Sequence, residues 1–200
     1  MRKLSISVLC TVSLLLLPAC SPRDFLTRRL ARDLIAASST FRAPQHFELR
    51  TGIVSNQEYL SPENLVLQHR GWISAAQARC APDITPPPCW DLTLTPSGVD
   101  TFRALLPPDD ASKQDFSIPA ARRELVAVTG ISKLGRAADV EFTWHWIPLN
   151  EVGAVLYSPD VHYRSTASFR CYDDGWRIVH GASHPSLPLD EALKSAEPVQ

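Results

Sequence analysis

The second half of the chain is dominated by alternation between apolar and polar side chains, the pattern of strands with one buried face. The alternation is strictest over residues 138–147 and returns over residues 161–172. Residues 120–131 predict a further strand, and Asp173-Asp174-Gly175 predicts a hairpin into a last short strand. We therefore expect an antiparallel meander over residues 118–184. The apolar side of the two alternating segments consists of Val140, Phe142, Trp144, Trp146, Val161, Tyr163, Ala167, Phe169 and Cys171.

The first half of the chain carries helical signals instead. Residues 24–39 repeat leucine every four positions, with Asp24 placed to cap an amphipathic helix. Ser61 and Pro62 mark the start of a second helix, which we expect to end before Gly71. The other elements expected here are a strand over residues 47–54, a strand over 90–95 and a helix over 96–105.

Changes in composition between these blocks predict the domain organisation. Residues 107–117, rich in Pro, Asp and Ser, predict a linker between residues 20–106 and the meander. Residues 185–200 are rich in Pro, with one helical turn expected over residues 189–195, and predict a loosely held tail. The expected fold class is α+β, with an N-terminal amphipathic helix, a small α/β block and a C-terminal antiparallel sheet.

The N-terminus carries an export signal. Arg2 and Lys3 precede an apolar run to Leu17, too short to cross a bilayer comfortably. The run ends in Leu17-Pro18-Ala19-Cys20, which resembles the lipobox of bacterial lipoproteins. That resemblance implies a signal peptide over residues 1–19, lipidation of Cys20 and a membrane partner reached through the lipid anchor. Because Ser21 rather than Asp follows the cysteine, it further implies the periplasmic side of the outer membrane.

The remaining cysteines predict one disulfide and one free thiol. Cys80 and Cys89 bracket a Pro-rich loop of about ten residues, and the oxidising compartment favours a bridge between them. Cys171 falls on the apolar side of its strand, so we expect a buried core thiol; a nucleophilic role would need a nearby cation.

Residues 61–105 show a modest local resemblance to the wing region of winged-helix proteins. The resemblance lies in Leu67-Gln-His-Arg-Gly71-Trp72-Ile73 and in Leu92-Thr-Leu-Thr95-Pro96-Ser-Gly98. It implies a wing-like α/β block but no DNA binding, because the protein is expected to be exported and its expected recognition helix has few basic residues. A helix covering a curved antiparallel sheet would also resemble cystatin-like or NTF2-like domains in architecture.

Composition and motifs narrow the function classes. Hydrophobic residues make up 44% and charged residues 20% of the 200 residues, and the formal net charge is −1, as in an ordinary globular domain. That charge does not favour a nucleic-acid partner. The sequence lacks the common hydrolase, nucleotide-binding and metal-binding motifs, so we expect no catalytic residues, no metal and no cofactor.

One candidate ligand-binding surface lies on the polar side of the alternating strands. We expect His145 and, on a neighbouring strand, His162, Arg164 and Arg170 to face outward together. Such a face would suit a carboxylate or phosphate, which arginine binds through two parallel hydrogen bonds. The alternative is a solvated face with Glu–Arg pairs across strands. The five tryptophans leave a similar choice between a ligand groove and core packing, and their strand positions favour the core.

The absence of catalytic motifs favours a non-enzymatic binding or scaffolding module with an envelope protein as its partner. The alternative is a ligand-binding cone with hydrolytic activity centred on His145, His162 and Arg164. An enclosed cavity lined by these three residues would favour that alternative, because acid–base catalysis needs a histidine within hydrogen-bond reach of a bound substrate.

Overall fold

The computed structural model describes residues 25–82, 84, 87–105, 115–180 and 187–199 and confirms the α+β class. The signal segment and Cys20 lie outside the described residues. The helices are α1 Arg28–Ala37, α2 Ser39–Arg42, α3 Asn56–Tyr59, α4 Pro62–His69, α5 Pro96–Arg103, α6 Glu151–Leu156 and α7 Leu189–Lys194. The strands are β1 Gln45–Arg50, β2 Gly52–Ser55, β3 Ile73–Ala78, β4 Cys89–Leu94, β5 Asp115–Leu134, β6 Ala137–Pro148, β7 His162–Tyr172, β8 Gly175–Ile178 and β9 Glu197–Val199.

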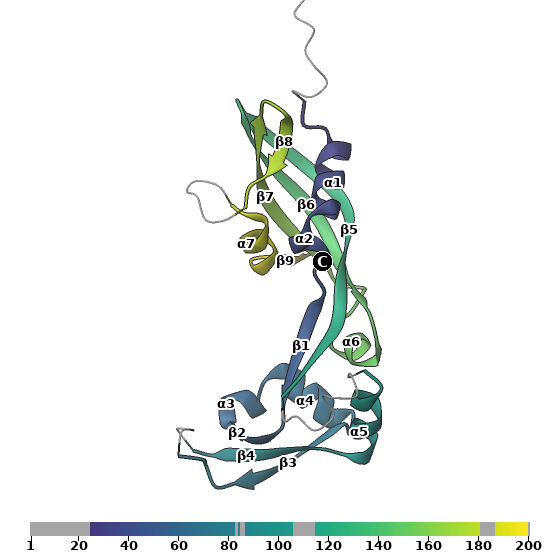
Figure 1. The fold of residues 1–200 in the computed structure, drawn as a ribbon, viewed down its shortest axis with the longest axis vertical. Helices are drawn as coiled ribbons and strands as arrows, with labels where there is room; N and C mark the ends of the chain where they lie inside the picture. The colour runs from purple at the N-terminus through teal and green to yellow at the C-terminus, as the bar shows by residue number, and fades with distance from the viewer. Residues whose placement is uncertain (1–24, 83, 85–86, 106–114, 181–186, 200) are drawn as a thin grey trace, which may run out of the picture.

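The strands form two sheets in an elongated molecule (Figure 1). Sheet A has the order β1-β5-β6-β7-β8, with β9 added beside β7, and every pairing is antiparallel. The expected meander is therefore present from β5 to β8. Sheet B is smaller, with the order β2-β4-β3, and lies at the other end of the molecule. We call residues 52–105 the sheet B lobe and the part of the molecule around α1, α2, α7 and β6–β8 the sheet A lobe.

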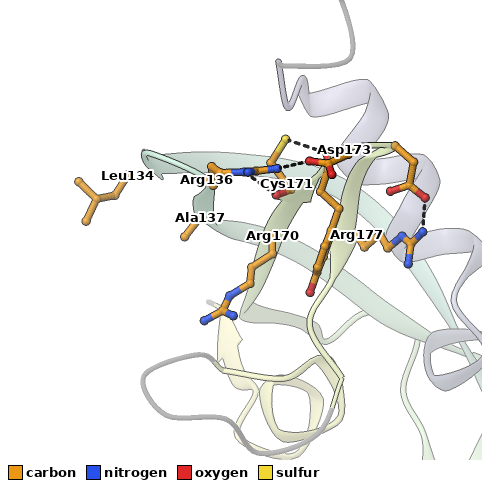
Figure 2. A pocket seen from close by; sticks show the side chains of 9 residues that line it. Leu134, Arg136, Ala137, Arg170, Cys171, Asp173 and Arg177 are labelled. Atoms are coloured by element: carbon orange, nitrogen blue, oxygen red, sulfur yellow. Dashed lines mark hydrogen bonds and ion pairs between the residues drawn. The ribbon is translucent and has the colours of Figure 1, made fainter.

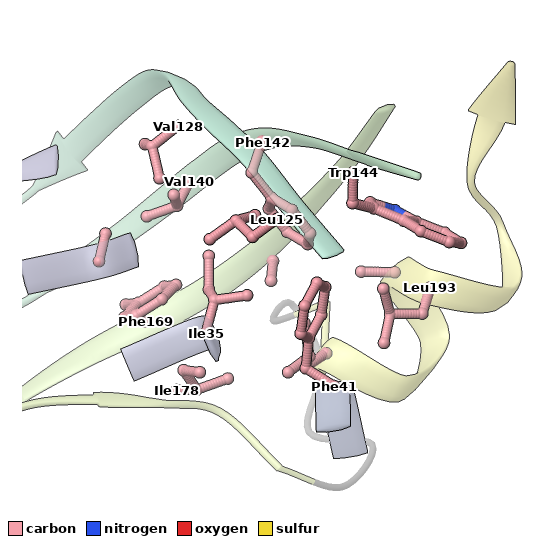
Figure 3. Packing of buried hydrophobic residues seen from close by; sticks show 14 of the residues in the cluster. Ile35, Phe41, Leu125, Val128, Val140, Phe142, Trp144, Phe169, Ile178 and Leu193 are labelled. Carbon is pink, nitrogen blue, oxygen red and sulfur yellow. The ribbon is translucent and has the colours of Figure 1, made fainter. Parts of the chain in front are cut away.

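Sheet A curls around its covering helices. The pairing of β5 with β6 shifts register between Leu125 and Ala127 and again between Val128 and Gly130, and such bulges increase twist and bend a strand. Helices α1, α2 and α7 pack on the face thus enclosed. Figure 3 shows Ile35 and Phe41 from the N-terminal helices meeting Phe142 and Phe169 of the sheet. The predicted apolar alternation of 138–147 is confirmed, since Val140, Phe142, Trp144 and Trp146 are all buried.

The C-terminal segment is not a loosely held tail. Leu189, Ala192 and Leu193 of α7 are buried in the core of the sheet A lobe, and β9 pairs with the start of β7. The prediction failed because the expectation rested on Pro content, whereas the apolar spacing of 189–193 supplies a buried helical face.

The sheet B lobe has a separate core, to which both β1 and the first third of β5 contribute. Phe47 and Leu49 of β1 and Phe116 and Ile118 of β5 pack there against sheet B and its helices. Within it, α4 begins after Ser61 and ends before Gly71 as predicted; the Ser61 hydroxyl accepts from the Asn64 amide at 3.3 Å. The side chains of Thr95 and Asn150 cap helices α5 and α6 in the same way, and α5 falls within the helix expected over 96–105.

Two predicted elements are divided in the structure. The strand expected over 47–54 separates into β1 of sheet A and β2 of sheet B, because Gly52 turns the chain with a φ of 89°. The N-terminal helix starts at Arg28, capped by Thr27 rather than Asp24, and is interrupted at Ser38. Of the expected linker, 107–114 lie outside the described residues, and 115–117 begin β5.

Candidate functional site

The structure brings three of the four expected ligand-face residues together. His145 and His162 are direct partners across β6 and β7, with ring centroids 5.3 Å apart. The Nδ1 of His145 donates to the Pro159 carbonyl at 2.9 Å, since a carbonyl only accepts, and its Nε2 lies 3.5 Å from a carboxylate oxygen of Glu124. Arg164 pairs with Glu197 of β9 at 3.3 Å.

Arg170 does not join this group. Arg170 follows Arg164 by six residues along β7, which is about 20 Å at the usual rise of a strand. His162 and Arg164 are exposed, so their face opens to solvent instead of enclosing a ligand. Glu197 pairs with Arg164, and Glu124 lies beside His145, so this face carries the kind of cross-strand contact with glutamate that the sequence left as the alternative.

Arg170 instead lines an open hollow of about 750 Å³ at the end of sheet A (Figure 2). The hollow lies where the β5–β6 and β7–β8 turns meet. Its lining is rich in arginine and includes two aspartates: Leu134, Arg136, Ala137, Arg170, Cys171, Tyr172, Asp173, Asp174 and Arg177.

The charges around this hollow are unevenly paired. Arg136 donates to Asp173 at 2.8 Å, and Arg177 forms an ion pair with Asp174. The Arg177 guanidinium also lies 5.4 Å from the centre of the Tyr172 ring. Within the described part of the chain, Arg170 has no carboxylate within ion-pair distance. The hollow therefore presents a cation whose charge no neighbouring acid offsets.

Cys171 also lines this hollow and is only half-buried, so the expectation of a fully buried thiol is corrected. Its side chain packs against the edge of the sheet A core, and its Sγ lies 3.6 Å from the Tyr172 carbonyl. The apolar alternation of β7 continues to its end, but the strand end borders an open hollow, so Cys171 is less well covered than Ala167 and Phe169, which are fully buried.

A half-buried arginine between the lobes was missed by the sequence reasoning. Arg123 points to the core side of sheet A, where its guanidinium lies 4.7 Å from the Trp146 ring centre and 5.6 Å from the Trp144 ring centre. It donates to the carbonyls of Thr40 and Ala43 at 3.4 and 3.5 Å. Burial lowers the pKa of Arg123 below its usual value, and the nearby Tyr157 acts in the opposite direction.

Tyr157 connects this arginine to a small polar cleft of about 270 Å³ between β1 and α4. Its ring centre lies 5.2 Å from that of Trp146. Burial is the main cause that raises the pKa of Tyr157, and the charge of Glu63 adds to it. At this cleft, burial and the charge of Glu63 thus favour the neutral phenol of Tyr157.

The same cleft borders an exposed Ser–His–Glu group that is not arranged for nucleophilic catalysis. Ser117 donates to Glu48 at 2.6 Å, so its hydroxyl proton points away from His46, whose Nδ1 lies 3.1 Å from Ser117 Oγ. A catalytic serine needs its proton directed at the base, which a third group then orients. Here the serine stands between the other two residues.

The sheet B lobe carries the predicted Cys80–Cys89 disulfide and an unprotected strand edge. The bridge has an S–S distance of 2.03 Å and holds the end of β3 to the start of β4. In the described chain, β3 pairs only with β4, which leaves its other edge open. The strand sequence Ile73-Ser-Ala-Ala-Gln-Ala78 holds neither a charge nor a proline, the usual protections of an edge.

The other sheet edges are shorter or charged. β2 has four residues, and so has β8, which carries Arg177. β1 alternates charged residues with its buried ones, including Glu48 and Arg50. Among the edge strands β1, β2, β3 and β8, β3 is therefore the best suited to receive an added strand; the part of β5 beyond its pairing with β1 is contacted by α1, whose Arg28 donates to the Thr129 carbonyl.

Comparison of the chain with protein-family models, with curated proteins and with solved structures returned no match. In the described residues, no three His, Cys, Asp or Glu side chains gather where they could hold a metal ion. None of the described helices has the length and apolar character needed to span a bilayer. Function must therefore be argued from the surfaces of the protein itself.

Proposed function

We propose that this protein is a lipid-anchored, non-enzymatic adaptor of the bacterial envelope, which binds an extended segment of another envelope protein along the open edge of β3. The observation that carries the proposal is that edge, six residues long, without charge or proline, at the opposite end of the molecule from the start of α1 (Figure 1).

Strand addition explains how such an edge would bind. An extended peptide aligned with β3 satisfies the outward N–H and C=O groups of the strand, which supply affinity without a deep pocket. Ser74 and Ala76 are exposed on one side of β3, and their small side chains leave room for a partner's side chains. The Cys80–Cys89 bridge keeps the strand pre-formed, which lowers the ordering cost of binding.

Anchoring is the second part of the proposal. The Leu17-Pro18-Ala19-Cys20 motif supports lipidation of Cys20 and location on the periplasmic side of the outer membrane. Three acyl chains on one cysteine would hold the protein firmly, since a single chain is marginal. The adaptor would then carry its binding edge away from the bilayer.

A photoreactive amino acid at Ala76 tests the proposal in intact envelopes. We expect it to crosslink to a protein, whereas the same probe at Ile53 in β2, on the opposite edge of sheet B, gives little of that product. The variant Ala76→Lys should lower recovery of the partner about tenfold or more, because an edge lysine opposes strand addition. The matched variant Gln57→Lys, on the exposed surface of α3, should leave recovery unchanged.

Equal recovery with Ala76→Lys and Gln57→Lys would refute binding at this edge. If no protein is crosslinked from Ala76, the adaptor role fails, and native mass spectrometry of the purified protein then tests the ligand-binding alternative. For that alternative, a retained small molecule should be lost in a His145→Ala and His162→Ala double variant.

A further inference from the structure

The described chain begins beside the turn ends of sheet A. The Lys133 ammonium lies 5.4 Å from the centre of the Phe25 ring and 5.2 Å from that of Trp176. In Figure 1 the start of α1 lies at the end of the molecule where β8 and the tip of β5 also lie. The first described residue and both hairpin turns therefore occupy one end of the molecule, opposite the sheet B lobe.

This end combines exposed apolar side chains with cations. Leu134, at the tip of the β5–β6 turn, is 86% exposed, and Phe25 is 52% exposed. We define the hairpin-end surface as Phe25, Lys133, Leu134, Arg136, Arg170, Tyr172 and Arg177.

Its four cations outnumber its neighbouring acids. Asp173 and Asp174 are engaged by Arg136 and Arg177 (Figure 2). Arg170 points into the open hollow, without an acidic partner among the described residues. Helix α1, which starts at this end of the molecule, carries exposed Arg29 and Arg32 against one exposed acid, Asp33, and the N-terminus of this ten-residue helix adds a partial positive charge. The end is therefore positive, although the whole chain has a formal net charge of −1.

The distance to the lipid anchor is short. Phe25 follows Cys20 by five residues, which span at most about 18 Å even when fully extended. Lipidation of Cys20 would therefore hold the hairpin-end surface at the headgroup layer of the membrane, whatever path those residues take.

We propose that the hairpin-end surface rests on anionic phospholipid headgroups and so orients the protein with its sheet B lobe away from the membrane. The inference rests on the proposed lipidation of Cys20. Arg170 suits a phosphate oxygen pair through its planar guanidinium, and Phe25 and Leu134 suit the apolar boundary just below the headgroups. The anchor supplies attachment, and this surface supplies orientation.

Headgroup quenching of a fluorescent amino acid tests the orientation. The probe replaces Ala137, which lines the hollow, or the matched exposed alanine Ala76 of β3, in purified lipidated protein. Vesicles of phosphatidylcholine, with or without phosphatidylglycerol, carry a lipid with a spin label on its headgroup. With phosphatidylglycerol we expect quenching at position 137 to be about threefold that at position 76 or more, and to fall as salt screens the charges.

Charge variants distinguish orientation by the hairpin-end surface from attachment through the lipid anchor alone. Lys133→Gln with Arg170→Gln should reduce the quenching at position 137 by about half in vesicles with phosphatidylglycerol, because each cation near an anionic surface contributes separately. The matched pair Arg70→Gln and Arg79→Gln removes two exposed arginines from the sheet B lobe and should leave it unchanged. Equal quenching at positions 137 and 76, or equal effects of the two pairs, would overturn the inference.

The mass of the N-terminal peptide from the same preparation shows which of the two proposals a negative result refutes. A peptide starting at an unmodified or absent Cys20 would refute the anchored adaptor itself. A lipidated peptide together with equal quenching at both positions would refute only the orienting surface and leave the adaptor proposal standing.

Discussion

Arg123 connects strand β5 to the segment that leads from α2 into β1. Its guanidinium lies against two tryptophans and donates to carbonyls of the segment between α2 and β1. Contacts of this kind with an aromatic face contribute about 0.5–2 kcal/mol, depending on exposure. The Nε atom has no hydrogen-bond partner in the described structure, so the side chain is held mainly by its planar stacking and its terminal nitrogens.

We expect Arg123→Ala to lower the free energy of unfolding by about 1–3 kcal/mol, because it removes the stacking and leaves two carbonyls without a donor. Urea denaturation followed by tryptophan fluorescence measures the change. Its neighbour Arg122 is exposed on the other side of β5, so Arg122→Ala should stay within about 0.5 kcal/mol of the wild type. Equal losses in both variants would contradict the assigned role.

Tyr157 predicts a change of stability at alkaline pH. Its pKa is raised above 10.0 in the folded protein, mainly by burial. Below pH 10.0 the phenol is neutral in both states; above it the unfolded chain loses the proton first, so stability falls until the folded phenol also ionises.

Tyr157→Phe should therefore have a free energy of unfolding that falls less steeply than that of the wild type as pH rises above 10.0. The difference between the two proteins, measured by urea denaturation at successive pH values, removes the contribution of the other titrating groups. Parallel curves for the two proteins would argue against the raised pKa of Tyr157.

At the scale of elements, α6 packs against β5 with almost no space between their backbones. A Cβ built on Gly153 would lie 1.8 Å from the carbonyl oxygen of Ala120, which is too close for any side chain. Since that carbonyl belongs to a buried strand, the helix would have to move away. The absence of a side chain at Gly153 thus sets how closely the α6 segment approaches sheet A.

Gly153→Ala should lower the free energy of unfolding by about 3 kcal/mol, because the clash is with backbone and not with a flexible side chain. Calorimetry or urea denaturation measures it. Gly130 is the control: a Cβ there would meet its nearest atom, Glu141 Cβ, at an ordinary 3.6 Å. Gly130→Ala should remain within about 0.5 kcal/mol of the wild type, and a tolerated Gly153→Ala would mean that α6 can shift freely.

Elements with local signals could be predicted from the sequence, whereas those decided by distant contacts could not. Ser61 marks the start of its helix as expected, because a cap is a local interaction between a side chain and a nearby amide, and Thr95 and Asn150 make the same interaction. The core side of β6 followed from simple alternation.

Long-range geometry accounts for what was missed. The two bulges in β5 change which side the residues after Leu125 face, so one regular alternation could not identify the core side of the whole strand, and Arg123, on the same side as Leu125, was missed with it. The separation of His145 and Arg170 follows from strand length and pairing, and the burial of α7 depends on the curl of sheet A. The sequence indicated which residue types could form a ligand-binding face or a core, but only the topology shows which of these residues lie together.

At the scale of the whole molecule, one bridge and two cores determine stability. The Cys80–Cys89 bridge closes a loop with a sequence separation of 9 within the sheet B lobe, while the sheet A lobe has no described disulfide. In the chain-entropy account, such a loop contributes about 2.5–3 kcal/mol. The contribution belongs to the lobe that carries the proposed binding edge.

Replacing both Cys80 and Cys89 by serine should therefore lower the free energy of unfolding by about 2.5–3 kcal/mol and weaken partner capture at β3. Urea denaturation and the crosslinking assay measure the two effects. Cys171→Ser, which removes a half-buried thiol and no bridge, should cost less than about 1 kcal/mol and leave capture unchanged. An unchanged stability of the double variant would show that the loop is held by other contacts.

The two strands that join the lobes have a mechanical consequence. β1 enters the sheet B lobe and β5 returns from it, antiparallel and paired from Gln45 opposite Ala121 to Arg50 opposite Asp115. If the proposed lipid anchor and the proposed partner at β3 pulled against each other, the force would run along both strands. The covalent backbone carries that tension directly, and the hydrogen bonds between the strands lie across its direction. The two strands are therefore suited to transmit a load between the two proposed attachment points.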